Sequence, residues 1–352
     1  MENLLHKKIY LKVFAVLAVL AVALFVFAAR DEKPQVLVFT GTTMTTGYSV
    51  KIVKNSFNAD DKSRYEKLIK KELRFVNYHM SPYKKGGDIY RINDAKAGIP
   101  VKVLPQVIEI LKYSQKISEM TGGAFDITVG PLIKLWGFYD RKELKKEPDL
   151  KEIEAAKKQI GYSNIILNEK ENTVVKKVEG LSINLSAIAK GRAVDMVFTA
   201  LEKVGLKNIM VEVGGEVRAC GQNQKGSFWK IGIENPVDTL ERQIVRVVSL
   251  KNSAIATSGD YRSYYFINNK RYSHTIDPVT GRPIEHGLAS VSVISDDCMT
   301  ADALATALTV MGSEKGMEFG KKHGLKLFFV NRDKDDGYIY SETDSFKEYG
   351  IK

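Results

Sequence analysis

The sequence predicts an α+β fold, with mixed sheets and packed helices, preceded by an N-terminal apolar helix. Some segments repeat apolar residues at helical spacing, and others alternate apolar with polar residues, which is typical of strands. These segments follow one another without the strict strand–helix alternation of a parallel α/β protein. The chain has 352 residues and is 44% hydrophobic, which suffices for one large core or two modest domains. Because no repeat and no Pro- or Ser-rich linker divides it, we expect one domain over residues 31–352.

The first thirty residues differ from the rest in composition. Lys7, Lys8 and Lys12 precede residues 13–29, a run of seventeen residues without a charge or a proline. This length lies between the core of a long signal peptide and a short transmembrane helix. The basic flank predicts that the N-terminus stays in the cytoplasm. We therefore expect residues 1–30 to be a membrane anchor or a signal segment. The domain that follows would lie on the extracytoplasmic side of the cytoplasmic or inner membrane.

The domain begins with a β segment and continues with helices. Residues 36–53 alternate and are rich in Thr and Val, which predicts a strand or a hairpin. Residues 60–78 have helical periodicity with many charges. Residues 81–93 contain one proline and two glycines, so they predict a loop. Residues 105–121 form an amphipathic pattern ended by paired glycines, as expected of a helix.

The remaining elements follow the same rules. Residues 150–161 predict a short helix ending in glycine, and residues 165–178 predict a β-hairpin. Residues 187–204 predict a helix, and residues 209–213 predict a strand. The last third predicts strands at 229–234, 243–250, 288–295 and 325–330, helices at 299–311 and 313–323, and a hairpin at 264–272 closed by two asparagines.

Charge and cysteine content limit the classes of partner. The formal net charge is +11, but many lysines are scattered among acidic residues, which is more typical of solvated helix faces than of a binding patch. No basic strip is interleaved with aromatic residues, so we do not expect nucleic acid as a partner. Cys220 and Cys298 are too few for a disulfide framework. An oxidising compartment would permit them to pair, but we expect two unpaired, buried thiols.

Asp302 and Thr306 are four residues apart in the small and apolar run 301–308. In a helix this spacing places both side chains on one face. A carboxylate and a hydroxyl are hard oxygen donors that suit Mg²⁺, which also keeps positions for water or phosphate oxygens. The alternative is that Asp302 caps a helix and Thr306 is merely packed.

Two glycine-containing segments predict contact with an anionic ligand. In residues 184–195, small residues lead into a helix start whose free N–H groups can receive a phosphate, and Lys190 would add a positive charge. The alternative is a helix capped by Ser186 with Lys190 in solvent. In residues 212–217 a strand runs into Gly-Gly, which allows close approach of a ligand but also serves any tight turn.

Two polar segments follow in the last third. Residues 254–260 place three short oxygen side chains around one glycine, which suits either a polar ligand or an ordinary turn. His274 and Asp277 are three residues apart before a turn that contains proline. His274 is a candidate general base, with a purely structural turn as the alternative.

Aromatic residues cluster near residues 122–138. Phe125, Trp136 and Phe138 could flank an aromatic ring of a ligand, although aromatic residues more commonly belong to the core. Met44 lies at the end of a candidate strand.

Together these segments resemble the ApbE family, the FAD:protein FMN transferases, over about residues 39–330. The resemblance is most specific at residues 254–260, 274–281 and 301–308. It implies an α+β fold that binds one FAD in a cleft, with Mg²⁺ near the pyrophosphate. Three places depart from the family pattern: Thr45 stands where Gly is frequent, Lys85 to Asp88 replace a segment with Pro, Asp and Ser, and Asn184 stands where Asp is common.

The resemblance also assigns roles to single residues. It implies that Asp302, Thr306 and the backbone carbonyl of Ala187 hold the metal. His274 would act as the general base, and Asp277 would orient it or act instead. The residues expected to contact FAD are Met44, Tyr83, Ala124, Phe125, Asp126, Asn184, Lys190 and Ile276.

The resemblance implies a phosphoryl-transfer reaction. A Ser or Thr hydroxyl on a target protein, expected to be a membrane redox subunit, attacks the FMN-side phosphorus of FAD, and AMP leaves. Mg²⁺ and Lys190 would stabilise the charge during transfer. Two alternatives remain: a Mg²⁺-dependent FAD pyrophosphatase in which water attacks, and a flavin-binding protein without turnover.

Overall fold

The computed structural model describes Phe14 and residues 33–351, with gaps at 140–143, 237–242, 261–262 and 334–336. The apolar helix expected within residues 1–30 falls outside this part, apart from Phe14. Within the described part, no helix combines the length and the apolar character needed to cross a bilayer.

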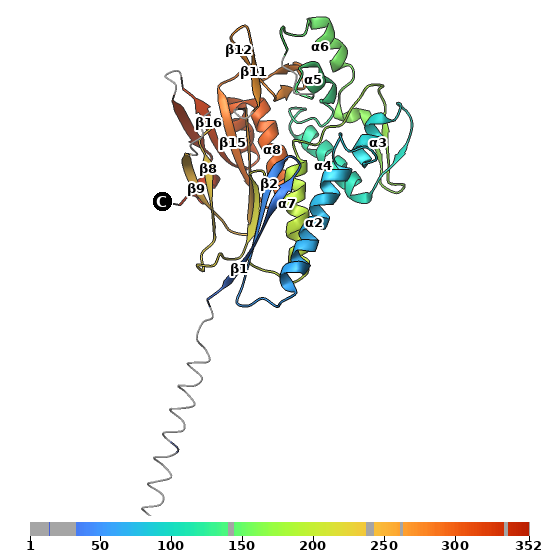
Figure 1. Cartoon of the computed structure of the whole chain (residues 1–352). Helices are drawn as coiled ribbons and strands as arrows, with labels where there is room; N and C mark the ends of the chain where they lie inside the picture. The colour runs from blue at the N-terminus through green and yellow to red at the C-terminus, as the bar shows by residue number, and fades with distance from the viewer. Residues whose placement is uncertain are drawn as a thin grey trace, which may run out of the picture.

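An eight-stranded sheet forms the centre of the molecule, and each of its neighbouring strands pairs antiparallel (Figure 1). This arrangement, with helices packed on the sheet, confirms the α+β prediction. In spatial order the strands are β1 (Gln35–Thr43), β2 (Thr46–Lys54), β6 (Ile209–Val213), β7 (Glu216–Cys220), β10 (Ser253–Gly259), β15 (Leu288–Ser295), β16 (Lys326–Arg332) and β17 (Tyr338–Glu342).

The two faces of this sheet bury different cores, as the alternation of side chains in a strand requires. In β10, Ala254 and Ala256 belong to the main core, whereas Ile255 belongs to a second core on the opposite face. The main core is shared with α2 (Asp61–His79), α4 (Pro105–Met120), α7 (Ala189–Lys203), α8 (Cys298–Met311) and α9 (Ser313–Lys322). The second core is covered by β8 (Trp229–Glu234), β9 (Ile244–Leu250) and α10 (Asp344–Lys347).

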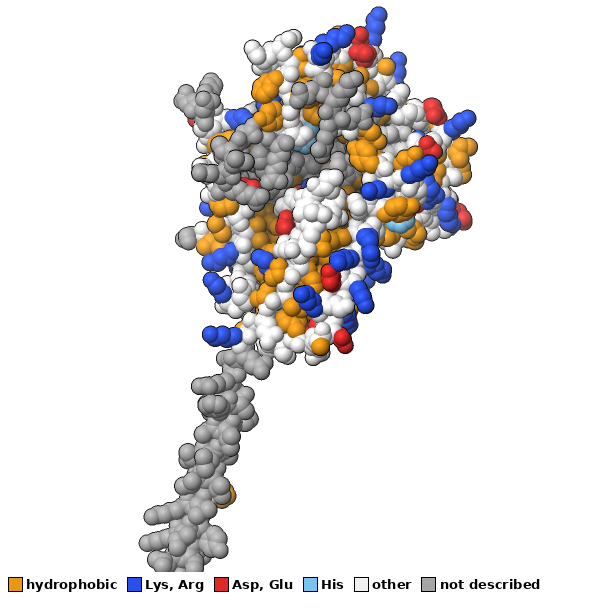
Figure 2. Space-filling model, viewed as in Figure 1, with side chains coloured by type: hydrophobic (Ala, Val, Ile, Leu, Met, Phe, Trp, Pro, Cys, Tyr) orange, Lys and Arg blue, Asp and Glu red, His pale blue; other side chains and the backbone are white. Residues whose placement is uncertain are grey.

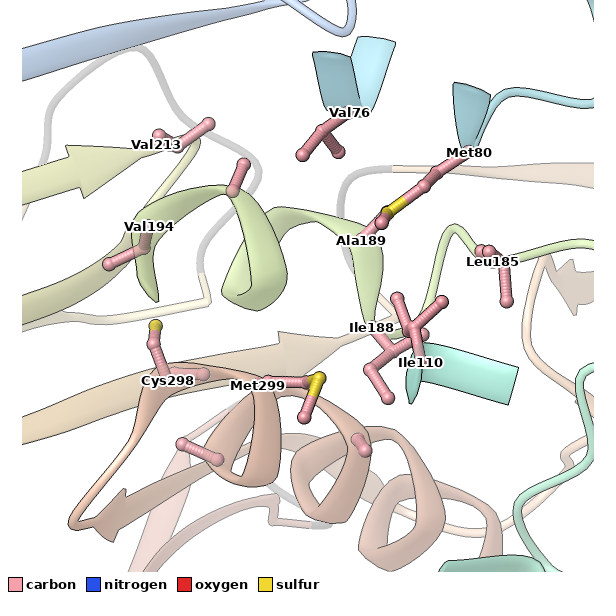
Figure 3. Close-up of a cluster of buried hydrophobic side chains, with 14 of the residues drawn as sticks. Val76, Met80, Ile110, Leu185, Ile188, Ala189, Val194, Val213, Cys298 and Met299 are labelled. Carbon is pink, nitrogen blue, oxygen red and sulfur yellow. The ribbon is translucent and has the colours of Figure 1, made fainter. Parts of the chain in front are cut away.

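Helix α7 lies between α2 and α8 (Figure 3). Val76 and Met80 of α2 lie on one side of α7, and Cys298 and Met299 of α8 lie on the other. All four side chains are buried. The N-terminal end of α7 is thereby fixed inside the main core, where its first turn meets α8.

A smaller lobe packs around Trp136, which is fully buried. The Trp136 indole donates to the Gly281 carbonyl at 2.9 Å, and the Tyr265 hydroxyl donates to the Trp136 carbonyl at 2.8 Å. The lobe contains α5 (Gly130–Leu135), α6 (Leu150–Lys157), β11 (Tyr264–Ile267), β12 (Lys270–Ser273), β13 (Ile276–Asp277) and β14 (Arg282–Pro283). A separate small sheet contains β3 (Val101–Lys102), β5 (Thr173–Lys176) and β4 (Ile165–Asn168), and β4 follows the short helix η1 (Tyr162–Asn164).

The loop predicted for residues 81–93 is wrong in its second half, where α3 (Asp88–Asp94) forms. The glycines that suggested a loop make the tight entry to this helix: Gly86 has a φ of 87°, and Gly87 is the N-cap. The Asp88 carboxylate is buried and accepts hydrogen bonds from Arg91 and from the Leu104 N–H. Leu104 is sixteen residues from Asp88, and this non-local hydrogen bond stabilises a helix that local composition disfavours.

Two other predictions concern the surface and the cysteines. Figure 2 shows Lys and Arg side chains spread over the visible face, with Asp and Glu among them. Cys220 and Cys298 are unpaired, as expected; Cys298 is buried and Cys220 is half-buried.

Candidate functional site

At the junction of α7 and α8, the expected metal residue Asp302 meets the first turn of α7. Asp302 is only 4% exposed, and its Oδ2 accepts a hydrogen bond from the Gly191 N–H at 2.9 Å. Helix α7 begins at Ala189, so this N–H belongs to the first turn, where backbone N–H groups have no acceptor within the helix. Ala187 lies just ahead of the helix, and within the described ranges its carbonyl accepts no hydrogen bond. That oxygen is therefore a candidate metal ligand.

Asp302 does not cap α8. The helix begins at Cys298, and its N-cap is Asp297, whose Oδ1 accepts from the Thr300 N–H at 2.8 Å. Asp302 lies in the second turn, and Thr306 follows one turn later, half-buried on the same face. The capping alternative for Asp302 is therefore wrong.

Lys190 lies between two carboxylates. Its Nζ is 2.5 Å from Oε1 of Glu216 and 3.7 Å from Oδ1 of Asp302. Burial lowers the pKa of Lys190, but the charges of Asp302 and Glu216 outweigh this and raise it above its usual value. Burial raises the pKa of Glu216 to about 7 against the opposing effect of Lys190. The alternative that placed Lys190 in solvent is wrong, because only 31% of its side chain is exposed.

Sequence reasoning missed Glu216. In the sequence, the Gly-Gly motif before it indicates either close approach of a ligand to the backbone or a tight turn. Neither interpretation involves the acidic residue that follows. The available signal was an acidic residue at the start of a short strand directly after two glycines, where a carboxylate is expensive to bury without a partner. The structure shows Glu216 to be 2% exposed.

The turn after β1 reaches the same place. Met44 and Thr45 have φ values of 46° and 60°, as a two-residue type I′ turn requires. A Cβ added to Gly214 would lie 2.9 Å from Thr46 Cγ2 and 3.2 Å from Lys190 Cδ. The β1–β2 turn, the Gly-Gly turn and Lys190 are therefore neighbours, which places Met44 beside the Lys190 site.

Asn184 and Asp126 shape the chain that enters α7. The Asn184 backbone N–H donates to the Ile127 carbonyl at 2.7 Å. The Oδ1 of the Asn184 side chain accepts from the Ser186 N–H at 2.9 Å. The Asp126 carboxylate accepts from Thr128 and from the Tyr162 N–H. Burial raises the pKa of Asp126, although these hydrogen bonds oppose the shift. Both polar side chains therefore accept hydrogen bonds from backbone N–H groups near the entry to α7.

Other residues expected to contact FAD vary widely in exposure. Phe125 is 1% exposed and belongs to the main core, and Ala124 beside it is half-buried. Ile276 is buried in the smaller lobe. Tyr83 is 55% exposed, and its ring centroid lies 4.9 Å from that of Tyr139.

His274 has a defined tautomer. Its Nδ1 is 2.9 Å from the Ser263 carbonyl, which can only accept, so Nδ1 carries the proton and the neutral ring has its lone pair on Nε2. The Phe138 ring lies edge-on at 6.5 Å between centroids. The side chain is exposed, yet protein atoms surround much of the ring, and this partial burial lowers the pKa of His274. The positive charge of Lys190 lowers the pKa of His274 further, whereas the charge of Asp260 opposes this shift.

Two candidate oxygen residues, Asp277 and Asp260, have hydrogen-bond or ion-pair partners within the protein. The Asp277 Oδ1 accepts from the Val279 N–H at 2.8 Å within the turn. Asp260 is buried and pairs with both Arg271 and Arg332. Residues 254–260 are mainly strand β10 rather than a turn, and Trp136 is core, as one of the alternatives held.

Comparison with known proteins agrees with this geometry. The model of the ApbE family matches residues 44–329. The FAD:protein FMN transferase of Haemophilus influenzae is 37% identical over 335 residues, 94% of this chain and 96% of that protein. The protein of the same name from Vibrio cholerae is 38% identical over 331 residues, covering 94% of this chain and 97% of that protein.

Solved structures show the same fold. The flavin transferase ApbE from Vibrio cholerae superimposes with a TM-score of 0.81 at 37% identity, covering 90% of this chain and 99% of that chain. The apo flavinyl transferase ApbE of Pseudomonas stutzeri also gives a TM-score of 0.81, at 34% identity, over 90% of this chain and 97% of that chain. These similarities over nearly the whole domain show that the chain belongs to the ApbE family.

Proposed function

We propose that the protein transfers the FMN part of FAD to a Ser or Thr hydroxyl of a target protein, forming a phosphoester and releasing AMP. Similar proteins are named FAD:protein FMN transferases. The structural observation that carries the proposal is the Gly191–Asp302 hydrogen bond. It fixes the Asp302 carboxylate against the first turn of α7, with Oδ1 3.7 Å from the Lys190 ammonium and Ala187 just ahead of the helix.

The oxygen donors at this place fit Mg²⁺. Asp302 Oδ1, the Ala187 carbonyl and the Thr306 hydroxyl are the hard ligands that this ion prefers, and three protein ligands leave positions for phosphate oxygens and water. When bound, the ion would supply positive charge beside the pyrophosphate. The Lys190 ammonium favours the same anionic group, whereas the N–H groups of Ile188, Ala189 and Gly191 at the start of α7 already have acceptors in the protein.

His274 is proposed as the general base. The acceptor hydroxyl oxygen forms a bond to the FMN-side phosphorus, its proton passes to Nε2 of His274, and the bond from that phosphorus to the bridging oxygen breaks. AMP leaves with the bridging oxygen. The Ser263 carbonyl holds the Nδ1 proton and so orients Nε2 as the acceptor. Asp277 would support the turn that carries His274, since its carboxylate is bonded within that turn.

The FAD-contacting residues are proposed by the same resemblance. Met44 has structural support, because its turn lies beside Lys190 through Thr46 and Gly214. Phe125, Asp126 and Asn184 would contribute backbone or shape, since their side chains are engaged in the core or with backbone. Tyr83, Ala124 and Ile276 complete the proposed set.

We also propose an extracytoplasmic, membrane-bound location and a membrane redox subunit as target. The support is the basic flank of three lysines before the apolar run 13–29. A protease-accessibility assay on spheroplasts, from which any outer barrier has been removed, tests the location. Protection of the domain until the cytoplasmic membrane is opened would place it on the cytoplasmic side.

Mass spectrometry tests the reaction. The full chain in detergent is incubated with FAD, Mg²⁺ and a candidate target protein, and the target should gain one FMN on a Ser or Thr. The same mixture without target separates the alternatives. Rapid release of FMN and AMP would indicate a pyrophosphatase, and FAD that stays intact even with several targets would indicate a flavin-binding protein.

A further inference from the structure

We infer that Glu216 is a positioning residue that holds the Lys190 ammonium away from Asp302, and thereby keeps Asp302 Oδ1 available to the metal. This inference rests on the proposed Mg²⁺ site. The resemblance to the family implies no role for Glu216. The positioning role follows from the place of its side chain beside Lys190 in the structure.

The distances show a competition between two carboxylates for one ammonium group. Lys190 Nζ is 2.5 Å from Glu216 Oε1, within hydrogen-bond range, and 3.7 Å from Asp302 Oδ1, beyond it. An ammonium group bonded to Asp302 Oδ1 would occupy the oxygen that a cation needs. It would also place a positive charge directly beside that cation. Lys190 is therefore hydrogen-bonded to Glu216 and not to Asp302.

The fold fixes Glu216 more firmly than it fixes Lys190. Glu216 is the first residue of β7 and pairs with Val213 of β6 across the two-residue Gly214–Gly215 turn. Both glycines have positive φ, at 65° and 106°. A side chain at position 214 would also press on the Lys190 stem, because its Cβ would lie 3.2 Å from Lys190 Cδ. The turn therefore brings the carboxylate to the lysine and leaves space for the lysine to pass.

Burial explains why the pair holds. Glu216 is 2% exposed, and within the described residues its other oxygen, Oε2, has no hydrogen-bond partner. A buried carboxylate without a compensating charge is costly, so Lys190 is drawn towards it. Asp302 differs, because its Oδ2 already accepts from the Gly191 N–H. The more weakly compensated carboxylate therefore holds the ammonium.

Mn²⁺ binding tests the inference without requiring catalysis. Free Mn²⁺ is measured by electron paramagnetic resonance with the full chain in detergent, without FAD. Glu216→Gln should weaken Mn²⁺ binding about tenfold, as expected for a residue that acts on a neighbour of a metal ligand rather than on the metal itself. Lys190→Met should bind Mn²⁺ at least as tightly as the wild type. In the Glu216→Gln/Lys190→Met double variant, the loss of Mn²⁺ affinity caused by the glutamine should disappear.

The double variant separates positioning from a general structural role. Unchanged Mn²⁺ affinity in Glu216→Gln, or a double variant as weak as Glu216→Gln alone, would overturn the inference. Weaker binding in Lys190→Met would also overturn it, and this arm remains decisive if Glu216→Gln does not fold. Glu216→Asp, which keeps the charge, should recover part of the affinity lost in Glu216→Gln. Asp302→Asn is the site control: if it binds Mn²⁺ as the wild type does, the metal site itself is wrong.

Discussion

The Asp302 carboxylate accepts the N–H of Gly191 at 2.9 Å, although the two residues are 111 positions apart. The bond joins the second turn of α8 to the first turn of α7. It supplies an acceptor to an N–H of the first turn, which has no partner within α7. One interaction thus ties two helices of the main core together.

Replacing Asp302 should separate its two roles. Asp302→Asn keeps an oxygen that can accept from Gly191, so it should fold with near wild-type stability. Loss of the charge should reduce FMN transfer at least about a hundredfold. Asp302→Ala should abolish transfer as well and lose a further 1–2 kcal/mol or so of unfolding free energy, because a buried N–H loses its acceptor. Urea denaturation and mass spectrometry of the target measure the two effects. Full transfer by Asp302→Ala would show the metal assignment to be wrong.

Gly191→Ala should destabilise the protein, although alanine is the better helix former. The new Cβ would lie 2.3 Å from the Cys298 carbonyl oxygen and 2.8 Å from Asp302 Cβ, so α7 and α8 must separate. We expect a loss of about 1–3 kcal/mol in the free energy of unfolding, measured in urea. Gly47→Ala is the matched control, since its nearest neighbour would be 4.0 Å away. A gain in stability for Gly191→Ala would contradict the close approach of the helices.

The rate of FMN transfer should depend on the protonation of His274. A base must be neutral, and the pKa of His274 is lowered by its surroundings from the usual 6.5. The rate should therefore hold as pH falls to 6.5 and decline only below it. His274→Ala should slow transfer about a hundredfold or more, lose this acid limb, and bind FAD nearly as well. His323→Ala, on the C-cap of α9, is the control. Loss of FAD binding in His274→Ala would make His274 a structural contact.

Asp260 should matter for stability rather than for FAD binding. Asp260→Asn removes the charge that pairs with Arg271 and Arg332, whose side chains are 27% and 33% exposed. Because the arginines reach solvent, we expect a loss of about 2 kcal/mol, below the usual cost of breaking a fully buried pair. Asp296→Asn, at an exposed position, should change stability by less than about 0.5 kcal/mol. A fall in FAD affinity with unchanged stability would instead make Asp260 a ligand contact.

Local patterns predicted most of the elements because their apolar periodicity agrees with the final packing. Helices α2 and α4 and the hairpin of β11 and β12 lie where the sequence placed them. The misassigned segments depend on distant partners. Helix α3 begins at a buried aspartate that accepts a hydrogen bond from the Leu104 N–H, and β10 owes its strand form to pairing with β7 and β15. No local pattern contains those partners.

The sequence by itself determined the fold class, the family and the identity of the expected metal residues, because residue type, spacing and order carry that information. Tertiary structure decided how those residues are used. Asp302 and Thr306 share a face by helical spacing, but only the packing of α7 on α8 brings the Asp302 carboxylate to the Gly191 N–H. Likewise, only the burial of Glu216 on β7 decides which carboxylate holds Lys190. Both outcomes depend on burial and on distances of a few ångströms between segments far apart in the chain, which linear order does not specify.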